Sequence, residues 1–167
     1  MRAAAVATIG LLGLACRPTE TPQQAEARMA TETAAARQAI DSLNTEFVSH
    51  FNQGHASVLA GHYTEAGSLM GPNAPAANGR AAVQSALEGL LAMKPQLSVV
   101  VESVVASGPL AVARGSYRMT LNPPGSPSPV TDVGKILVHW QNVDGKWLMA
   151  ADMFNSDLPV APGAPTK

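Results

Sequence analysis

The sequence lacks most of the features that assign a function directly. Only 14% of its 167 residues are charged and the formal net charge is −1, so neither sign of charge is in surplus. No cluster of lysines and arginines is present, so there is no electrostatic reason to expect nucleic acid or an anionic membrane surface as a partner. A glycine-rich phosphate loop and the nucleophile elbow of serine hydrolases are also missing. We therefore expect no nucleic-acid partner and no cofactor.

An apolar run at the N-terminus has the pattern of a secretory signal. Arg2 precedes an apolar stretch that ends at Leu14 and is too short to span a bilayer comfortably. Gly13 and Ala15 supply the small residues that a signal peptidase needs. We expect residues 1–15 to be a signal peptide, and the folded part to work outside the cytoplasm, in a bacterial periplasm.

Cysteine is nearly absent, because Cys16, directly after this segment, is the only one. It has no disulfide partner within the chain, and an unpaired cysteine in an exported protein needs an explanation. Its position resembles that of the acylated cysteine of bacterial lipoproteins. We therefore expect Cys16 to carry lipid and to hold the protein at a membrane. The alternative is plain secretion with a free thiol.

The histidines do not predict a metal centre. His50, His55 and His62 lie close together in the sequence. His55 and His62 are seven residues apart, so a helix would place them on one side but two turns apart, which is too far to share one ion. No cysteine supports them as a further ligand, and we expect no metal site.

A polar, proline-containing segment leads into the first predicted helix. Residues 16–30 are predicted to be a flexible tether. From about Thr31, apolar residues recur at three- and four-residue steps and predict a helix that stops near Gly54. The apolar stripe of this helix consists of Ile40, Leu43, Phe47 and Phe51.

Two shorter helical stretches come next. Residues 55–63 predict a second helix that ends at Tyr63. After a short extended piece at residues 67–72 and a loop, residues 79–94 predict a third helix with Asn78 as its N-cap.

After the helices the period changes to that of β-strands. Valine-rich residues 96–107 and alternating residues 110–122 are predicted strands. Residues 131–142 and 145–156 are predicted to form a hairpin with a short turn. Helices followed by antiparallel strands argue for an α+β domain, in which three N-terminal helices pack on a strongly curved, mainly antiparallel sheet.

Four short motifs follow one another along the chain: FNQGHASVLAGHYTEAGSLMGP, NGRAAVQSAL, GPLAVARGSYRMT and DVGKILVHWQNVDGKWLMAADMFNSDLP. Together they resemble the nuclear-transport-factor-2-like superfamily, which includes ketosteroid isomerases and SnoaL-like domains, and are most similar to domain-of-unknown-function group 4440. The resemblance implies a cone-shaped barrel with a pocket at its wide end, and homodimers through the outer face of the sheet. It covers about residues 32–159, so we place one domain at residues 31–159 and expect residues 160–167 to be a disordered tail.

The resemblance also shows which catalytic groups are missing. Isomerases of this superfamily use a carboxylate base before a proline and an oxyanion-binding tyrosine in the first helix. By the resemblance, Gly71 and Phe47 stand at these positions, and neither side chain transfers a proton. Steroid isomerisation by that route is therefore not expected.

The stretch GKWLMAADMFNSDLP carries the acid of greatest interest, Asp152. Strand alternation gives Asp152 three apolar neighbours on one face of the strand, namely Leu148, Ala150 and Phe154. Such neighbours would desolvate the carboxylate and raise its pKa, as a general base requires. The alternative is that Asp152 binds a backbone amide or an arginine, such as Arg80 or Arg114, and only stabilises the strand.

Several other side chains are candidates for the pocket. His139 has an imidazole suited to proton transfer near neutral pH, although a strand histidine beside a tryptophan is more often a packing residue. Tyr117 could offer a hydroxyl, so His139 and Tyr117 are the candidate helpers of Asp152. The candidate ligand-binding residues are Phe47, Tyr63, Met70, Met119 and Asn155.

These observations leave three functions open. The first is a module that binds a small apolar organic molecule in the cone without catalysis. The second is an enzyme of isomerase, hydratase or cyclase type that uses Asp152 as general base. The third is a structural dimerisation module with a solid core. The missing groups at Gly71 and Phe47 favour the binding module.

Overall fold

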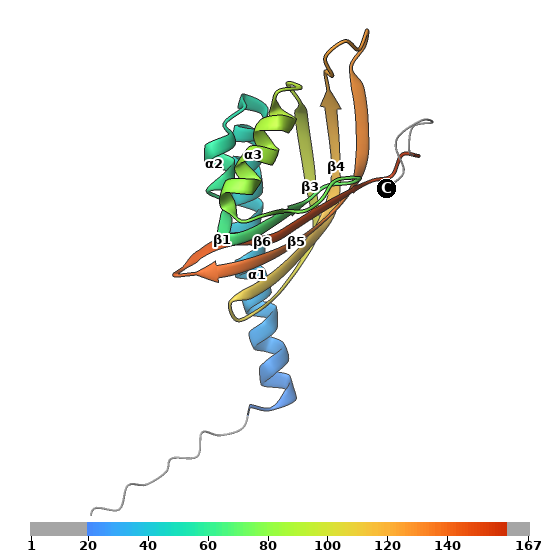
Figure 1. The fold of residues 1–167 in the computed structure, drawn as a ribbon. Coiled ribbons are helices and arrows are strands. Elements are labelled where there is room, and N and C mark those ends of the chain that lie inside the picture. The colour runs from blue at the N-terminus through green and yellow to red at the C-terminus, as the bar shows by residue number, and fades with distance from the viewer. Residues whose placement is uncertain (1–19, 160–167) are drawn as a thin grey trace, which may run out of the picture.

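The computed structural model describes residues 20–159, and its fold is drawn in Figure 1. The predicted signal peptide, Cys16 and the tail at residues 160–167 lie outside the described residues. The proposed domain boundaries remain predictions.

The first helix begins earlier than its apolar pattern predicts. Helix α1 spans Pro22–Gln53, with Thr21 as its N-cap. The Thr21 hydroxyl accepts from the Gln24 amide N–H, and the Gln24 side chain accepts from the Thr21 amide N–H. This reciprocal capping, with proline at the first helical position, favours a helix start at this point. The expectation of an irregular segment up to residue 30 and a helix from about Thr31 is therefore wrong.

The rest of α1 agrees with the prediction. Ile40 and Phe51 are buried in the core, and Leu43 and Phe47 pack against it. The helix ends at Gly54, which adopts φ 80° and donates its N–H to carbonyls of the last turn. A left-handed residue at this point is tolerated best by glycine.

Two short helices follow, and both end earlier than predicted, α2 at Ala60 instead of Tyr63 and α3 at Leu91 instead of Lys94. Helix α2 spans Ala56–Ala60, and Tyr63 begins a strand instead of ending this helix. Helix α3 spans Arg80–Leu91, and its N-cap is Gly79, with no side-chain cap, instead of Asn78. Asn78 accepts from the Ser68 hydroxyl at 2.7 Å and is paired in the sheet.

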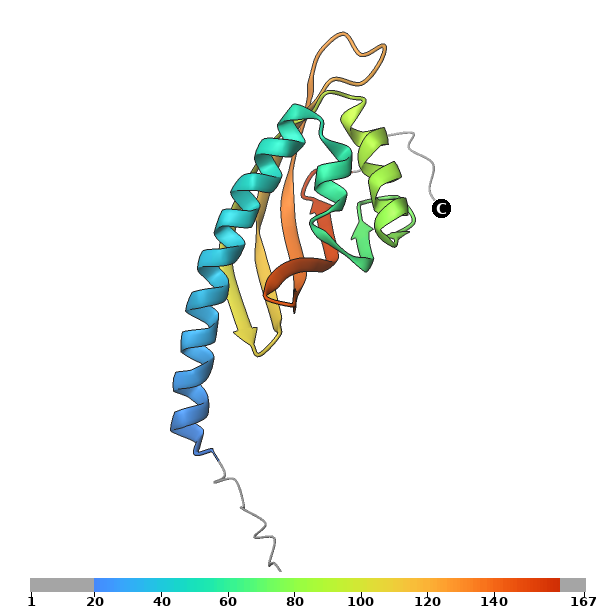
Figure 2. The same cartoon turned by 90° about the vertical axis from the view of Figure 1, so that its left-hand side faces the viewer.

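Six strands form one sheet in the order β2-β1-β6-β5-β4-β3, in which only the β1–β6 pair is parallel. Figures 1 and 2 show the sheet curving around one side, on which the three helices lie. The fold is therefore the predicted α+β architecture, with helices on a curved and mainly antiparallel sheet. The strands are β1 (Tyr63–Met70), β2 (Ala77–Asn78), β3 (Gln96–Ser107), β4 (Leu110–Leu121), β5 (Val130–Val143) and β6 (Lys146–Ser156).

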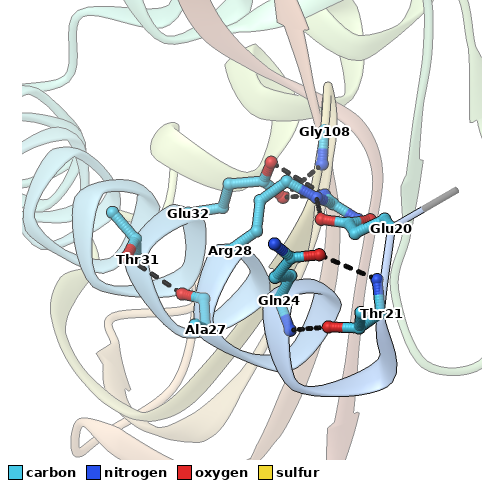
Figure 3. A network of polar contacts seen from close by, with 8 residues as sticks. All are labelled: Glu20, Thr21, Gln24, Ala27, Arg28, Thr31, Glu32 and Gly108. Carbon is cyan, nitrogen blue, oxygen red and sulfur yellow. Dashed lines mark hydrogen bonds and ion pairs between the residues drawn. The ribbon is translucent and has the colours of Figure 1, made fainter. Parts of the chain in front are cut away.

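A network of polar contacts ties the first turns of α1 to the sheet (Figure 3). Arg28 donates to Glu20 and to Glu32, and Glu32 also accepts from the backbone N–H of Gly108 at 2.9 Å. Gly108 lies in the turn between β3 and β4. The exposed start of the helix is therefore held by hydrogen bonds rather than by apolar burial.

A bulge in β6 decides which side chains reach the interior. His139 on β5 pairs with Ala151, whereas the next residue, Trp140, pairs with Met149, so Ala150 is an extra residue. Such an insertion reverses the alternation on one side of it. Met149 therefore shares the inner face with Asp152, and the expectation that Leu148 and Ala150 lie there is wrong.

Candidate functional site

A cavity of about 90 Å³ lies between the helices and the concave face of the sheet. One water needs roughly 10–15 Å³ on this measure, so about 90 Å³ has room for roughly six to nine waters or for a molecule with about that many non-hydrogen atoms. No lysine, arginine or histidine is among the described residues that line it. The lining residues are Ile40, Asn44, Phe47, Phe51, Tyr63, Leu69, Leu87, Leu90, Leu97, Val99, Val101, Ala113, Tyr117, Met119, Ile136, Val138, Trp140, Met149, Asp152 and Phe154.

Aromatic side chains are concentrated on this cavity. The whole chain has three phenylalanines, two tyrosines and two tryptophans, and six of these seven line the cavity. Only Trp147 does not. The Tyr117 and Phe154 rings meet edge to face, with centroids 5.7 Å apart. Most of the aromatic residues of the protein therefore contribute to the wall of one cavity.

Asp152 is the only carboxylate of the lining. It comes from β6, and its Oδ2 accepts a hydrogen bond of 2.7 Å from the hydroxyl of the fully buried Tyr63 on β1. Burial raises the pKa of Asp152 to about 6, and the Tyr63 hydrogen bond acts in the opposite direction. Burial and the neighbouring Asp152 both raise the pKa of Tyr63, so its hydroxyl keeps its proton and serves as donor.

The ion pairs predicted for Asp152 do not form. Arg80 binds Glu65 and donates to the Tyr63 carbonyl at 2.8 Å, while Arg114 binds Glu102 at 3.1 Å. The reading of Asp152 as the partner of an arginine is therefore wrong. No cation contributes to its raised pKa, so the ionised carboxylate has no counter-charge in the described part of the chain.

The second tyrosine of the chain repeats this arrangement elsewhere on the cavity wall. Tyr117 on β4 donates to Asp132 at 2.6 Å, and Asp132 also accepts from the Ser156 hydroxyl. Burial and the bond to Asp132 raise the pKa of Tyr117. Asp132 itself is not part of the lining. The Tyr117 hydroxyl is thus already committed as a donor, and its oxygen can accept from a ligand.

Two further polar groups belong to the lining. Trp140 on β5 is 4% exposed, and its Nε1–H has no hydrogen-bond partner in residues 20–159. Leaving a buried donor unsatisfied costs roughly 1–3 kcal/mol, so this position lowers the stability of the fold. Asn44 on α1 adds an amide to the same cavity.

The other predicted site residues divide into two groups. Phe47 and Met119 line the cavity, and their role in ligand binding stays a prediction. Met70, Asn155 and His139 do not. His139 alternates with Val138 and Trp140, which face inward, so it lies on the outer face of β5 and cannot assist Asp152.

The position of the isomerase base is occupied by an aromatic ring. A Cβ atom on Gly71 would stand 2.9 Å from Cζ of Phe154, closer than such atoms approach without a shift. Phe154 therefore fills the space that a larger residue at position 71 would need. Phe47 lies against Phe51 with ring centroids 6.2 Å apart, in the helix where the resemblance implies a tyrosine.

The structure brings together two histidines that the sequence spacing did not connect. Nδ1 of His50 and Nδ1 of His55 are 3.0 Å apart across the end of α1, and both are at least partly exposed. Within residues 20–159, no group of three or more His, Cys, Asp or Glu is placed to hold a metal ion. The contact between the two imidazole rings is therefore a hydrogen bond.

Asn44, Phe51 and Trp140 were not recognised as site residues from the sequence. Phe51 continues the apolar stripe of α1, so the four-residue step from Phe47 could have indicated it. Alternation along β5 places Trp140 on the inner face of the sheet once His139 is known to lie on the outer face. Nothing in the sequence distinguishes Asn44 from an exposed helical asparagine.

Residues 44–149 match the SnoaL-like domain family. The chain belongs to this family. The match spans more than half of the chain and ends three residues before Asp152. Membership of the narrower group 4440 stays a prediction. No curated protein matches the chain in sequence.

Solved structures place the fold among its relatives. An NTF2-like protein with a cystatin-like fold from Novosphingobium aromaticivorans has a TM-score of 0.66 and 18% identity, covering 85% of this chain and 94% of its own. A ketosteroid isomerase-like protein from Erwinia carotovora has a TM-score of 0.64 and 20% identity, covering 73% and 96%. A protein of unknown function with a cystatin-like fold from Nostoc punctiforme has a TM-score of 0.64 and 13% identity, covering 80% and 96%. These similarities confirm the cone fold.

Among residues 20–159, no helix has the length and apolar character needed to cross a membrane. Attachment through Cys16 stays a prediction.

Proposed function

We propose that the domain binds a small, mainly apolar organic molecule in its cavity, with the polar end of that molecule at Asp152. The observation that carries this proposal is the concentration of aromatic and aliphatic side chains around one cavity whose lining holds a single carboxylate. Apolar pockets with a few placed polar groups are the usual form of small-molecule sites. The cavity also argues against the third possibility, a core packed solid for dimerisation alone.

A matched pair of variants tests this proposal. Val99 lines the cavity, so Val99→Phe should fill it, whereas Val143 is 41% exposed at the end of β5 and Val143→Phe should not. Calorimetry with small neutral aromatic and alicyclic probes, such as indole and cyclohexanone, should show binding to the parent protein and to Val143→Phe only. Equal binding to Val99→Phe would place the probes elsewhere and contradict the proposal.

One observation supports an enzyme as the second candidate. A carboxylate whose pKa is raised to about 6 by burial is suited to take a proton next to a carbonyl group. Asp152 would act as the base, and Tyr63 would hold it in position through their hydrogen bond. The test is deuterium exchange at the α-carbon of cyclohexanone in D2O. The enzyme reading requires exchange that Asp152→Asn removes, and exchange equal to that in buffer would reject it.

We also propose that the protein is exported and held at a membrane by lipid on Cys16. The N-terminal signal pattern and the position of the only cysteine support this. Expression of the full chain in a bacterium should give a membrane-bound, acylated form, seen by mass spectrometry, and Cys16→Ser should release it. An unmodified, soluble Cys16 thiol would favour plain secretion instead.

A homodimer through the outer face of the sheet is proposed as the assembly. Apolar side chains on that face are unusually exposed for a monomer, which favours a partner. These side chains include Val100 at 62%, Val105 at 59%, Val112 at 45%, Leu137 at 50% and Met153 at 45% exposed.

A further inference from the structure

We propose that the cavity selects a small organic amine, whose ammonium group pairs with the Asp152 carboxylate inside a cage of aromatic rings. This inference rests on the proposed binding function and specifies the chemical class of its ligand. Three properties of the cavity support it, namely its charge balance, its aromatic lining and its size.

The charge balance of the cavity favours a cation. Asp152 is the only charged side chain in the lining, and its one hydrogen bond comes from Tyr63, a neutral group. Arg80 and Arg114 are engaged with Glu65 and Glu102. A buried carboxylate without a cationic partner is costly, and a ligand ammonium would supply that partner. A carboxylate or phosphate on the ligand would add a second negative charge beside the first and would be rejected.

The aromatic lining acts in the same direction. A cation close to the face of an aromatic ring is attracted by the ring quadrupole, most strongly when water is excluded. Tyr63 and Asp152 come from neighbouring strands, and Asp152 and Phe154 lie two residues apart on the inner face of β6. Phe47, Tyr117 and Trp140 line the same cavity from other elements.

The size and the remaining polar groups restrict the ligand further. About 90 Å³ holds a single ring with a short side chain rather than a steroid or a lipid. Asn44 is a further polar residue of the lining, and its amide can bond an oxygen or an N–H on the ligand. An aryl or alicyclic amine, with or without an ether or carbonyl oxygen, satisfies these requirements.

Three probes of nearly the same shape and different charge test the inference. Benzylamine, benzyl alcohol and benzoate are titrated calorimetrically into the purified protein at about pH 8, where the Asp152 carboxylate is ionised. Benzylamine should bind about tenfold or more tightly than benzyl alcohol, and benzoate should not bind. In Asp152→Asn, which keeps an oxygen that can accept from Tyr63, the preference for the amine should disappear.

A control with the same change of charge is available in the β5–β6 turn. Asp144 is exposed and adopts φ 51°, a conformation that asparagine tolerates, so Asp144→Asn should fold normally. It should keep the amine preference, whereas a loss there would show a long-range charge effect and overturn the assignment to Asp152.

The possible outcomes separate this inference from the proposed function. If benzyl alcohol binds as tightly as benzylamine, the cavity binds ligands but the amine assignment fails. If none of the three binds and the neutral probes also fail, both proposals fail. If benzylamine binds Asp152→Asn as well as the parent, the ammonium does not pair with Asp152 and the inference is overturned.

Discussion

At the scale of single residues, the burial of Asp152 determines how the molecule responds to pH. Its carboxylate lies among apolar side chains with one neutral donor, the Tyr63 hydroxyl. The charged form is therefore less favourable in the folded protein than in the unfolded chain. The ionised Asp152 carboxylate therefore lowers the free energy of unfolding. Such a cost is typical of a residue that is retained for catalysis or binding.

Replacing Asp152 with asparagine should stabilise the protein most at neutral pH. The folded pKa of about 6 lies above the ordinary value of 3.8, so the folded state holds the proton more tightly between these values. The free energy of unfolding therefore falls as pH rises through this window, and the loss is complete above the folded pKa. Asparagine lacks the charge, so its advantage should grow by roughly 1–2 kcal/mol between about pH 4.5 and pH 7.5. Urea unfolding at both pH values measures this, and an advantage independent of pH would contradict it.

Gly71 should resist substitution because of the Phe154 ring. The Cβ of an alanine at position 71 would stand 2.9 Å from Cζ of Phe154, so the ring must move. We expect Gly71→Ala to cost about 1–3 kcal/mol of stability, as overpacking does. The cost should shrink in a Phe154→Leu background, where the ring is absent, and a double-mutant cycle by thermal unfolding measures that coupling. Additive effects would show that the ring does not limit position 71.

At the scale of elements, the Thr33 hydroxyl is one of several α1 groups that bond to the edge strand β3, together with Arg37 and Asn52. Thr33 Oγ1 accepts from the Ala106 N–H at 3.0 Å and donates to the Ala106 carbonyl at 3.3 Å. Thr33→Val keeps the shape and leaves both backbone groups unpaired, so it should cost about 1–3 kcal/mol. Thr31→Val is the matched control, because its hydroxyl bonds only to the exposed Ala27 carbonyl within the helix. Equal losses of stability in the two variants, measured by urea unfolding, would reject the assigned role.

Elements with strong periodicity were predicted well from the sequence. The valine-rich run matches β3 from Gln96 to Ser107, because β-branched side chains and alternation both favour a strand there. The start of α1 was missed because residues 22–30 are mostly exposed and have no apolar stripe. Only the Thr21 and Gln24 capping pair marked it.

The site was predicted in part for a similar reason. The sequence indicated five of the lining residues, namely Asp152, Tyr117, Phe47, Tyr63 and Met119. The alternation of strands and the three- and four-residue spacing of helices show which side chains share a face. The bulge at Ala150 could not be foreseen, because it depends on how β5 and β6 pair and leaves no mark in the sequence of β6 alone. Leu148 and Ala150, the neighbours of Asp152 on its N-terminal side, were therefore wrongly assigned to the inner face.

At the scale of the whole molecule, the two faces of the sheet differ in what covers them. The inner face and the helices enclose the cavity, while the outer face leaves Leu137 50% exposed. If the outer face forms a homodimer, Leu137→Glu should yield a monomer in light scattering and still bind the cavity probes. Val58→Glu, at a similarly exposed valine on helix α2, should stay dimeric. A parent protein that is already monomeric at micromolar concentration would contradict the proposed dimer.

The most direct test of the account is the pKa of Asp152, measured by NMR titration of its side-chain carboxyl carbon in the folded protein, with Asp152→Asn used to assign the signal. We expect a pKa of Asp152 near 6, because its carboxylate lies on the wall of an apolar cavity without a cationic partner. A pKa at or below the ordinary value of 3.8 would mean a solvated or paired carboxylate. That result would contradict the proposed cavity site.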